Sequence, residues 1–308
     1  MNTLSAGTSR FLRRQFAAAI GLVALAAFAV DVPARDQTRT PVQAPALPGA
    51  GAPIPSGDRV YTADQSSNTV TVIDPATHRV LGTIALGQAR VDGVLGPFDD
   101  DQVKVHGLGF SRDGTLLSVA AVTSNAAMVI DTASNKLMHT TYLRRAPHEG
   151  FISPNGKTLW VAERGVDTVA IIRLGEDDSD EKMRRIQTGK GPSKVVFSPD
   201  GRLAYVNHFS ENVLVVIDVA SRFVVKASFE SGRRSNHINF VTFQQAAYAY
   251  VTVGDLNLTK VYLRADRYTN APRQTGQIAH TVVGDAGTNC QPHGNWPSPD
   301  NTRMYVAL

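Results

Sequence analysis

SPDGRLAYVN, residues 198–207, is the stretch of this 308-residue chain that decides its fold. An Asp-Gly pair is followed at once by a short apolar run, which is typical of a β-hairpin. The same frame returns four more times, with a serine or threonine ahead of the turn at positions 111, 153, 242 and 298. The steps are 42, 45, 44 and 56 residues, and a period of about 40–50 residues is typical of a solenoid or a propeller.

Strand patterns decide between these two architectures. Runs of four to six residues, rich in β-branched side chains, follow the turns, as in Leu203–Val206 and Val213–Asp218. Gly, Asn, Asp and Pro bound them, so they indicate strands. Several runs are apolar at consecutive positions, which favours sheets covered on both faces. Because four strands per unit make a propeller blade, we predict an all-β chain, a β-propeller of four-stranded antiparallel blades.

Turn residues support this prediction. Aspartates end three of the strands and are expected to bond the next backbone amides, a structural role: Asp74, Asp131 and Asp218. Three turns carry Asp-Gly or Asn-Gly, which suit tight hairpins whose central residues take positive φ: Asp113-Gly114, Asn155-Gly156 and Asp200-Gly201.

Tyr205-Val206-Asn207, with Val215–Asp218 after it, resembles the signature of the YVTN-type β-propeller repeat family. The segment Val60–Val70 matches the same pattern, and the resemblance covers residues 58–308. It implies an extracytoplasmic protein with a ring of seven blades. It says little about function, because a fold does not fix one.

The chain holds fewer than seven units. We expect five blades in whole or part, plus a partial sixth, with units at residues 58–87, 106–145, 148–190, 193–232 and 237–285. The sequence stops at Tyr305–Leu308, inside the second strand of the next unit. We therefore expect an incomplete ring and a C-terminally truncated fragment; a short open array is the alternative.

The N-terminus predicts export. Three arginines precede the apolar stretch Phe16–Val30, and small residues follow, so residues 1–34 are typical of a signal peptide. Arg13-Arg14 partly matches the twin-arginine signal, and the general secretory route is the alternative. The stretch is too short for a permanent membrane anchor. Residues 35–57 predict a Pro/Ala-rich linker, and the protein should be periplasmic or secreted.

The net charge and the cysteine content limit which partners and which covalent links the protein can have. The formal charge is +4, and loss of residues 1–34 would lower it to +2, which gives no strong signal for nucleic acid. The single cysteine excludes an intramolecular disulfide. We expect a protein or small-molecule ligand, of unknown identity, to bind at the channel face, where the innermost strands of the blades begin.

Histidines give the sharpest functional hypothesis. In four of the five repeats a histidine stands five residues before the serine or threonine that precedes the turn: His106, His148, His237 and His293. The remaining repeat has Ser193 at this position. Residues at one register of the innermost strands should form a ring around the channel mouth. Imidazole suits copper and zinc among other metals, so we predict a metal site here, with copper or zinc. A packing role is the alternative; we assign surface or packing roles to the other histidines.

Other readings stay open. Glu149 and Arg164 could serve acid–base and anion-binding roles in a propeller enzyme of lactonase type, and a metal- or haem-linked redox protein is a further alternative. No haem attachment motif, nucleophile motif or phosphate loop is present. Cys290 and His293 have the spacing to share a soft metal, and Asp177–Glu181 predicts a solvated acidic loop. A binding module is favoured over an enzyme.

Overall fold

The computed structural model describes residues 57–65, 67–86, 104–175, 183–222, 224–229, 231–264, 272–280, 290–298 and 302–308. The predicted signal peptide, residues 1–34, lies outside these ranges, as do linker residues 35–56 and the acidic loop at 177–181. Residues 51–308 form one compact unit. Within the described ranges, no helix is long and apolar enough to cross a membrane.

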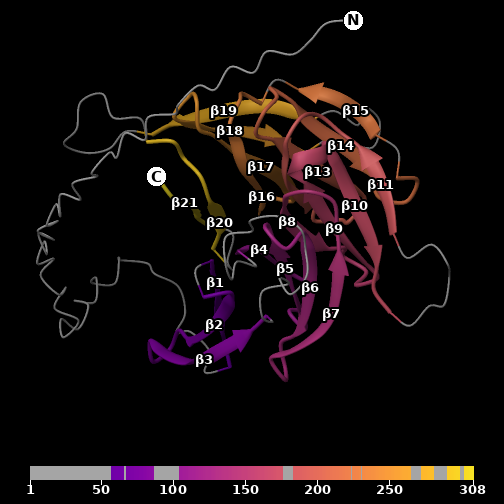
Figure 1. Cartoon of the computed structure of the whole chain (residues 1–308). Coiled ribbons are helices and arrows are strands. Elements are labelled where there is room, and N and C mark those ends of the chain that lie inside the picture. Colours follow the sequence, from indigo (N-terminus) through magenta and orange to yellow (C-terminus); the bar gives the residue numbers. More distant parts are fainter. Residues whose placement is uncertain are drawn as a thin grey trace, which may run out of the picture. The chain divides into compact units, whose positions relative to one another are not determined.

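Antiparallel sheets follow one another along the chain (Figure 1). The first blade holds three strands, β1 (Val60–Asp64), β2 (Thr69–Asp74) and β3 (Arg79–Ala85). The second holds β4 (Val105–Phe110), β5 (Leu116–Ala121), β6 (Ala126–Asp131) and β7 (Lys136–Tyr142). The third holds β8 (Pro147–Ile152), β9 (Thr158–Glu163), β10 (Thr168–Arg173) and β11 (Met183–Gln187), with a 3-10 turn η1 (Arg164–Val166) between β9 and β10.

The last sheets complete the described part. The fourth blade holds β12 (Pro192–Phe197), β13 (Leu203–His208), β14 (Leu214–Asp218) and β15 (Val224–Phe229). The fifth holds β16 (Ser235–Phe243), β17 (Ala246–Val253), β18 (Leu258–Leu263) and β19 (Arg273–Ala279). A two-stranded sheet of β20 (Asn295–Pro297) and β21 (Met304–Val306) follows.

First strands of consecutive sheets contact one another in the order β1, β4, β8, β12, β16 and β20. This is the arrangement of a propeller, in which each blade turns its first strand toward a common centre. The prediction of an all-β propeller with four-stranded antiparallel blades and an incomplete ring is confirmed for the described residues.

The turns between the first two strands share one geometry in the second, third and fourth blades, whereas in the fifth blade both turn residues, Gln244 and Gln245, take positive φ. In the second blade, the Gly114 amide donates to the Ser111 carbonyl oxygen at 3.0 Å, and the Leu116 amide donates to Ser111 Oγ at 2.9 Å. Positive φ falls on the glycine alone, at 72° for Gly114, so the prediction that both central residues take positive φ was wrong. A four-residue loop with one left-handed position needs glycine only there. The strand-ending aspartates bond the following amides as predicted, for example Asp131 with Ser134.

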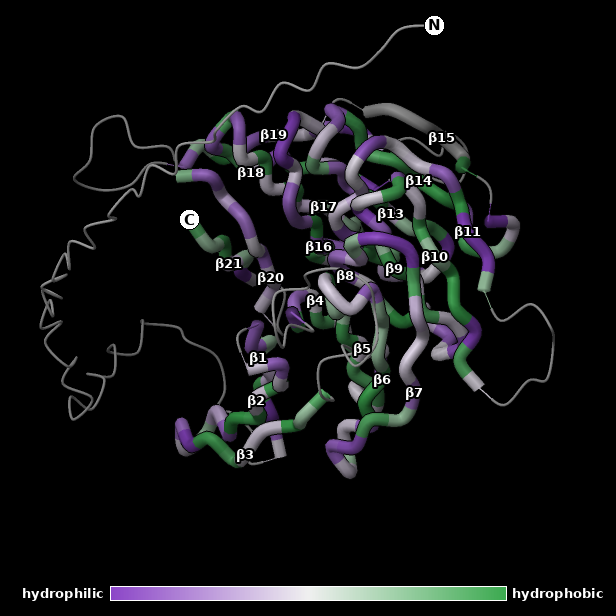
Figure 2. The backbone as a smooth tube through the Cα atoms, in the orientation of Figure 1, coloured by the Kyte–Doolittle hydropathy of each residue, from purple (hydrophilic) through white to green (hydrophobic). Residues whose placement is uncertain are grey.

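Apolar clusters lie between consecutive blades rather than inside any one blade. Val70 and Val72 of β2 pack with Leu117 and Val119 of β5, and three further clusters join the later blades in the same way. Figure 2 shows the hydrophobic stretches gathered in middle strands such as β6, β9, β10 and β14. Each middle strand is therefore covered on both faces, which explains its runs of consecutive apolar residues.

Candidate functional site

A shift in strand pairing marks the start of the first strand in four blades. The pairing skips His106 in β4, His148 and Glu149 in β8, Ser193 in β12, and Asn236 and His237 in β16. A bulge bends its strand and redirects side chains, and bulges are frequent next to functional sites. The four bulges therefore fall on the register that the sequence singled out.

The structure brings the four predicted histidines into two pairs. The rings of His106 and His148 lie 4.2 Å apart between centroids, and those of His237 and His293 lie 4.9 Å apart. Glu149 joins the pairs, because it follows His148 in β8 and its Oε1 lies 3.0 Å from Nε2 of His237. The sequence-based grouping thus matches the geometry, while metal binding by these residues stays a prediction.

Among the described residues, His106, His148 and Glu149 form a group of three potential metal ligands. One ligand atom from each residue lies within 4.8 Å of the other two. Nδ1 of His148 lies 2.9 Å from the Ser193 carbonyl oxygen. A carbonyl accepts only, so Nδ1 carries the proton and Nε2 keeps its lone pair, the arrangement usual for metal-binding histidines. Nδ1 of His106 is buried and has no hydrogen-bond partner.

Burial keeps these imidazoles neutral. It lowers the pKa of His148 well below its ordinary value, helped by the Arg164 charge, and it lowers the pKa of His106. The pKa of His293 falls to about 4, first through burial and then through repulsion from His237. Neutral imidazole is the form that binds metal, so these residues stay competent below the pH at which a free histidine is protonated.

Glu149 is buried and charged. Burial alone would raise its pKa, but His237 and Lys194 together hold that pKa far below the usual value. Nζ of Lys194 lies 3.6 Å from Oε2 of Glu149, and both side chains are almost fully enclosed. A buried carboxylate persists only when it is paired in this way.

Arg164 brings a second cation to the same place. It donates to Oγ of Ser193, and its guanidinium lies 4.9 Å from the centre of the Phe209 ring. Burial lowers its pKa to about 10, so it remains charged at neutral pH. Arg164 and Glu149 lie in the same blade, as the sequence predicted, and the Glu149 charge partly offsets the lowering of the Arg164 pKa.

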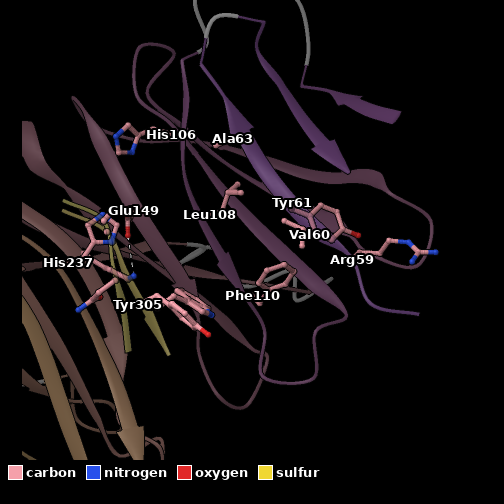
Figure 3. A pocket seen from close by; sticks show the side chains of 15 residues that line it. Arg59, Val60, Tyr61, Ala63, His106, Leu108, Phe110, Glu149, His237 and Tyr305 are labelled. Carbon is pink, nitrogen blue, oxygen red and sulfur yellow. Dashed lines mark ion pairs between the residues drawn. The ribbon is translucent and has the colours of Figure 1, made fainter. Parts of the chain in front are cut away.

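A cavity of about 720 Å³ opens beside this cluster (Figure 3). Its polar end carries His106, Glu149, Lys194 and His237. Aromatic and apolar side chains from several sheets line much of the rest: Tyr61, Leu108, Phe110, Trp296 and Tyr305. Arg59 lies at the end away from His106, Glu149 and His237 (Figure 3). This combination of an apolar wall with a few converging polar groups is typical of a small-molecule site.

Gly107 lets β4 approach β8 closely enough to build the cluster. A Cβ at this position would lie 2.3 Å from the His148 carbonyl oxygen and 2.5 Å from Cγ of Glu149. Contacts this short cannot be accommodated without moving backbone. The small residue next to His106 thus permits the 4.2 Å ring separation from His148.

The remaining histidines lie elsewhere, as predicted. His78 and His139 are exposed, His208 is fully buried, and His280 bonds Thr259 at 2.8 Å. Cys290 is buried, and its thiol donates to the His280 carbonyl oxygen at 3.4 Å. A metal shared by Cys290 and His293 stays a prediction.

Sequence reasoning missed Lys194, the basic partner of Glu149. The signal was present, because Lys194 follows Ser193 as Glu149 follows His148. Equivalent positions in consecutive blades face one another near the centre. An acid and a base at one register in neighbouring repeats could therefore have predicted the ion pair.

Comparisons with known proteins support the propeller fold. A family model described as lactonase, 7-bladed β-propeller, matches residues 122–229. The hydrazine synthase subunit beta of Kuenenia stuttgartiensis is 28% identical over 36% of this chain and 33% of that protein. The chain thus matches about a third of the length of that curated relative.

Solved structures agree. Hydrazine synthase of Kuenenia stuttgartiensis superposes with a TM-score of 0.58 at 21% identity, covering 82% of this chain and 70% of that one. A putative 6-phosphogluconolactonase from Bacteroides uniformis gives 0.57 at 18%, covering 73% and 69%. The dihydro-heme d1 dehydrogenase NirN, in complex with DHE, gives 0.55 at 15%, covering 82% and 49%. At these identities the likeness concerns the fold; the YVTN-type assignment stays a prediction.

Proposed function

We propose that this chain is an exported ligand-binding β-propeller whose site holds a transition-metal ion, zinc or copper, between His106, His148 and Glu149. The observation that carries the proposal is that ligand atoms of three residues lie within 4.8 Å of one another, and that His106 has a buried nitrogen without a hydrogen-bond partner. Buried polar atoms are normally paired, so Nδ1 of His106 is suited to an ion that supplies the missing partner.

The donor set fits zinc or copper. Two neutral imidazoles and one carboxylate leave a coordination position open, as in catalytic rather than structural zinc sites. The hydrogen bond from His148 to the Ser193 carbonyl would orient its ring toward the ion. The open position would face the cavity, where a ligand could reach the metal.

Zinc titration by calorimetry tests the proposal. The parent should bind one equivalent, and His106→Gln and Glu149→Gln should each weaken binding at least tenfold, because each removes a ligand. His139→Gln is the matched control, since His139 is exposed on β7 and should leave binding unchanged. Zinc binding by His106→Gln as tight as in the parent would overturn the assignment.

Lactone hydrolysis is a second candidate, favoured by the Glu149–His237 pair at 3.0 Å beside the cavity and by the family-model match. Glu149 would orient His237, which would take a proton from water as the water attacks the lactone carbonyl. The ring C–O bond then breaks, and the alkoxide leaves with the proton from His237. Lys194 would stabilise the oxyanion.

An assay of glucono-δ-lactone hydrolysis tests this candidate. The reaction is monitored by the release of acid, with a chelator present. The protein should exceed the spontaneous rate, and His237→Gln should reduce the rate to the spontaneous one while His139→Gln does not. A parent rate equal to the spontaneous rate excludes lactonase activity on this substrate and leaves the metal-binding proposal unaffected.

A further inference from the structure

Cations outnumber anions in the buried cluster. Lys194 and Arg164 are both positively charged, and Glu149 is the carboxylate that the described residues place between them. The neighbouring acid Glu163 is engaged elsewhere, because both its oxygens accept from Arg185 at 2.9 and 3.0 Å. Counted over Lys194, Arg164 and Glu149 alone, the cluster has an excess of one positive charge.

An excess of positive charge destabilises the folded protein when the charged side chains are buried. Lys194 is only 1% exposed, and an uncompensated buried charge is strongly unfavourable. Glu149 divides its two oxygens between His237 and Lys194. A bound anion would complete the pairing, and a divalent metal at His106, His148 and Glu149 would increase the need for one.

Aromatic rings define the shape of the space next to this charge. Nζ of Lys194 lies 4.9 Å from the centre of Phe151 and 5.2 Å from that of Trp296. These two rings stack at 6.2 Å with an interplanar angle of 21°. Trp296 nevertheless stays 48% exposed and lines the cavity. Tyr305 lines it too (Figure 3). A flat ligand can therefore lie on the free face of Trp296.

We infer that the cavity binds a planar aromatic carboxylate, with the carboxylate at Lys194 and the ring against Trp296. The inference rests on the proposed function for the location of the site and deepens it by naming the ligand class. The charge excess exists without metal, so binding should occur in the metal-free protein and strengthen when zinc is bound. Coupling of this kind is reciprocal: the carboxylate should tighten zinc binding by the same factor.

Calorimetry with benzoate and benzamide, in the presence of a chelator, is the test. The two molecules share a ring, but only benzoate is charged; benzoate should bind at least tenfold tighter. This comparison needs no variant. Equal binding of the two would reveal an apolar pocket without anion recognition and overturn the inference, as would the absence of benzoate binding.

Variants then locate the site. Lys194→Met should lower benzoate affinity at least tenfold, Lys194→Arg should largely restore it, and Trp296→Leu should weaken it. Lys190→Met is the matched control, because Lys190 is exposed four residues away and should not matter. Unchanged affinity in a folded Lys194→Met protein overturns the inference. Benzoate binding without any zinc binding would sustain this inference and refute the proposed metal site.

Discussion

At the scale of single residues, His208 shows how neighbours fix a protonation state. Its Nδ1 lies 2.9 Å from the Val213 carbonyl oxygen, and the Gly189 amide donates to its Nε2 at 3.0 Å. One partner accepts and the other donates, so the imidazole carries a proton on Nδ1 and a lone pair on Nε2. Burial lowers the pKa of His208 to about 4.

Stability should therefore fall in mild acid. Above the unfolded-state pKa of about 6.5 neither state binds the proton. Between about pH 6.5 and 4, His208 is protonated in the unfolded chain but not in the folded protein. The free energy of unfolding therefore decreases as the pH is lowered, by up to about 3 kcal/mol. Denaturant unfolding at pH 7.5 and 5 should show this loss. His208→Asn should reduce the pH dependence and exposed His78→Asn should not; equal slopes in all three proteins would contradict the account.

Glu149 and Lys194 form a buried pair whose members should be strongly coupled. Glu149→Gln or Lys194→Met alone should lower the free energy of unfolding by about 3–5 kcal/mol, since each removes one partner of a buried charge. The double variant should lose less than the sum. Chemical denaturation of the four proteins measures the coupling; additive losses would show that the pair contributes nothing as a pair.

Residue-level prediction from sequence succeeded where a repeat frame existed. The frame grouped His106, His148, His237 and His293 correctly in space, with Ser193 beside them. It did not predict the bulges that redirect these side chains, because a pairing shift depends on the neighbouring strand. The repeat frame also did not predict that two cations, Lys194 and Arg164, would share one carboxylate in a buried cluster. Which side chains become buried together depends on how the blades pack.

At the scale of elements, the close approach of β4 to β8 determines the site. Gly107→Ala should destabilise the protein by about 1–3 kcal/mol through overpacking and should separate the His106 and His148 rings. Gly276→Ala on β19 is the control, because no atom lies within 4 Å of its added Cβ and alanine suits a strand better than glycine. Thermal unfolding distinguishes them; equal melting temperatures for the two variants would contradict the packing argument.

Strand existence was predictable because apolar runs and turn residues are local signals. The turn geometry was only partly predictable. Asp113-Gly114 indicated a tight turn, but in the structure the Ser111 hydroxyl accepts from the Leu116 amide and positive φ falls on the glycine alone. The side-chain bond to the backbone is thus part of the turn.

At the scale of the whole molecule, stability rests on contacts between neighbouring blades, as expected for a repeat architecture. The period together with the strand patterns predicted a propeller, since the apolar faces of successive sheets need one another. Function was less predictable, because the same fold supports many sites. In this chain the candidate site is the polar cluster at the inner strands.

Export is a prediction for the whole chain. Expressed in a bacterium with both export routes, the protein should lose residues 1–34 and accumulate outside the cytoplasm, because the N-terminus has the three parts of a signal peptide. Mass spectrometry of the mature N-terminus measures the cleavage. Replacing Arg13 and Arg14 by lysine should block export only on the twin-arginine route; a cytoplasmic protein that keeps Met1 would contradict the prediction.

The central claim is that the inner-strand cluster holds a metal ion, and anomalous X-ray diffraction from crystals grown with one equivalent of zinc tests it most directly. We predict one strong peak within bonding distance, about 2.0–2.2 Å, of His106, His148 and Glu149. A peak only at exposed histidines such as His78 or His139, or no peak at the cluster in a crystal that contains zinc, would contradict the account.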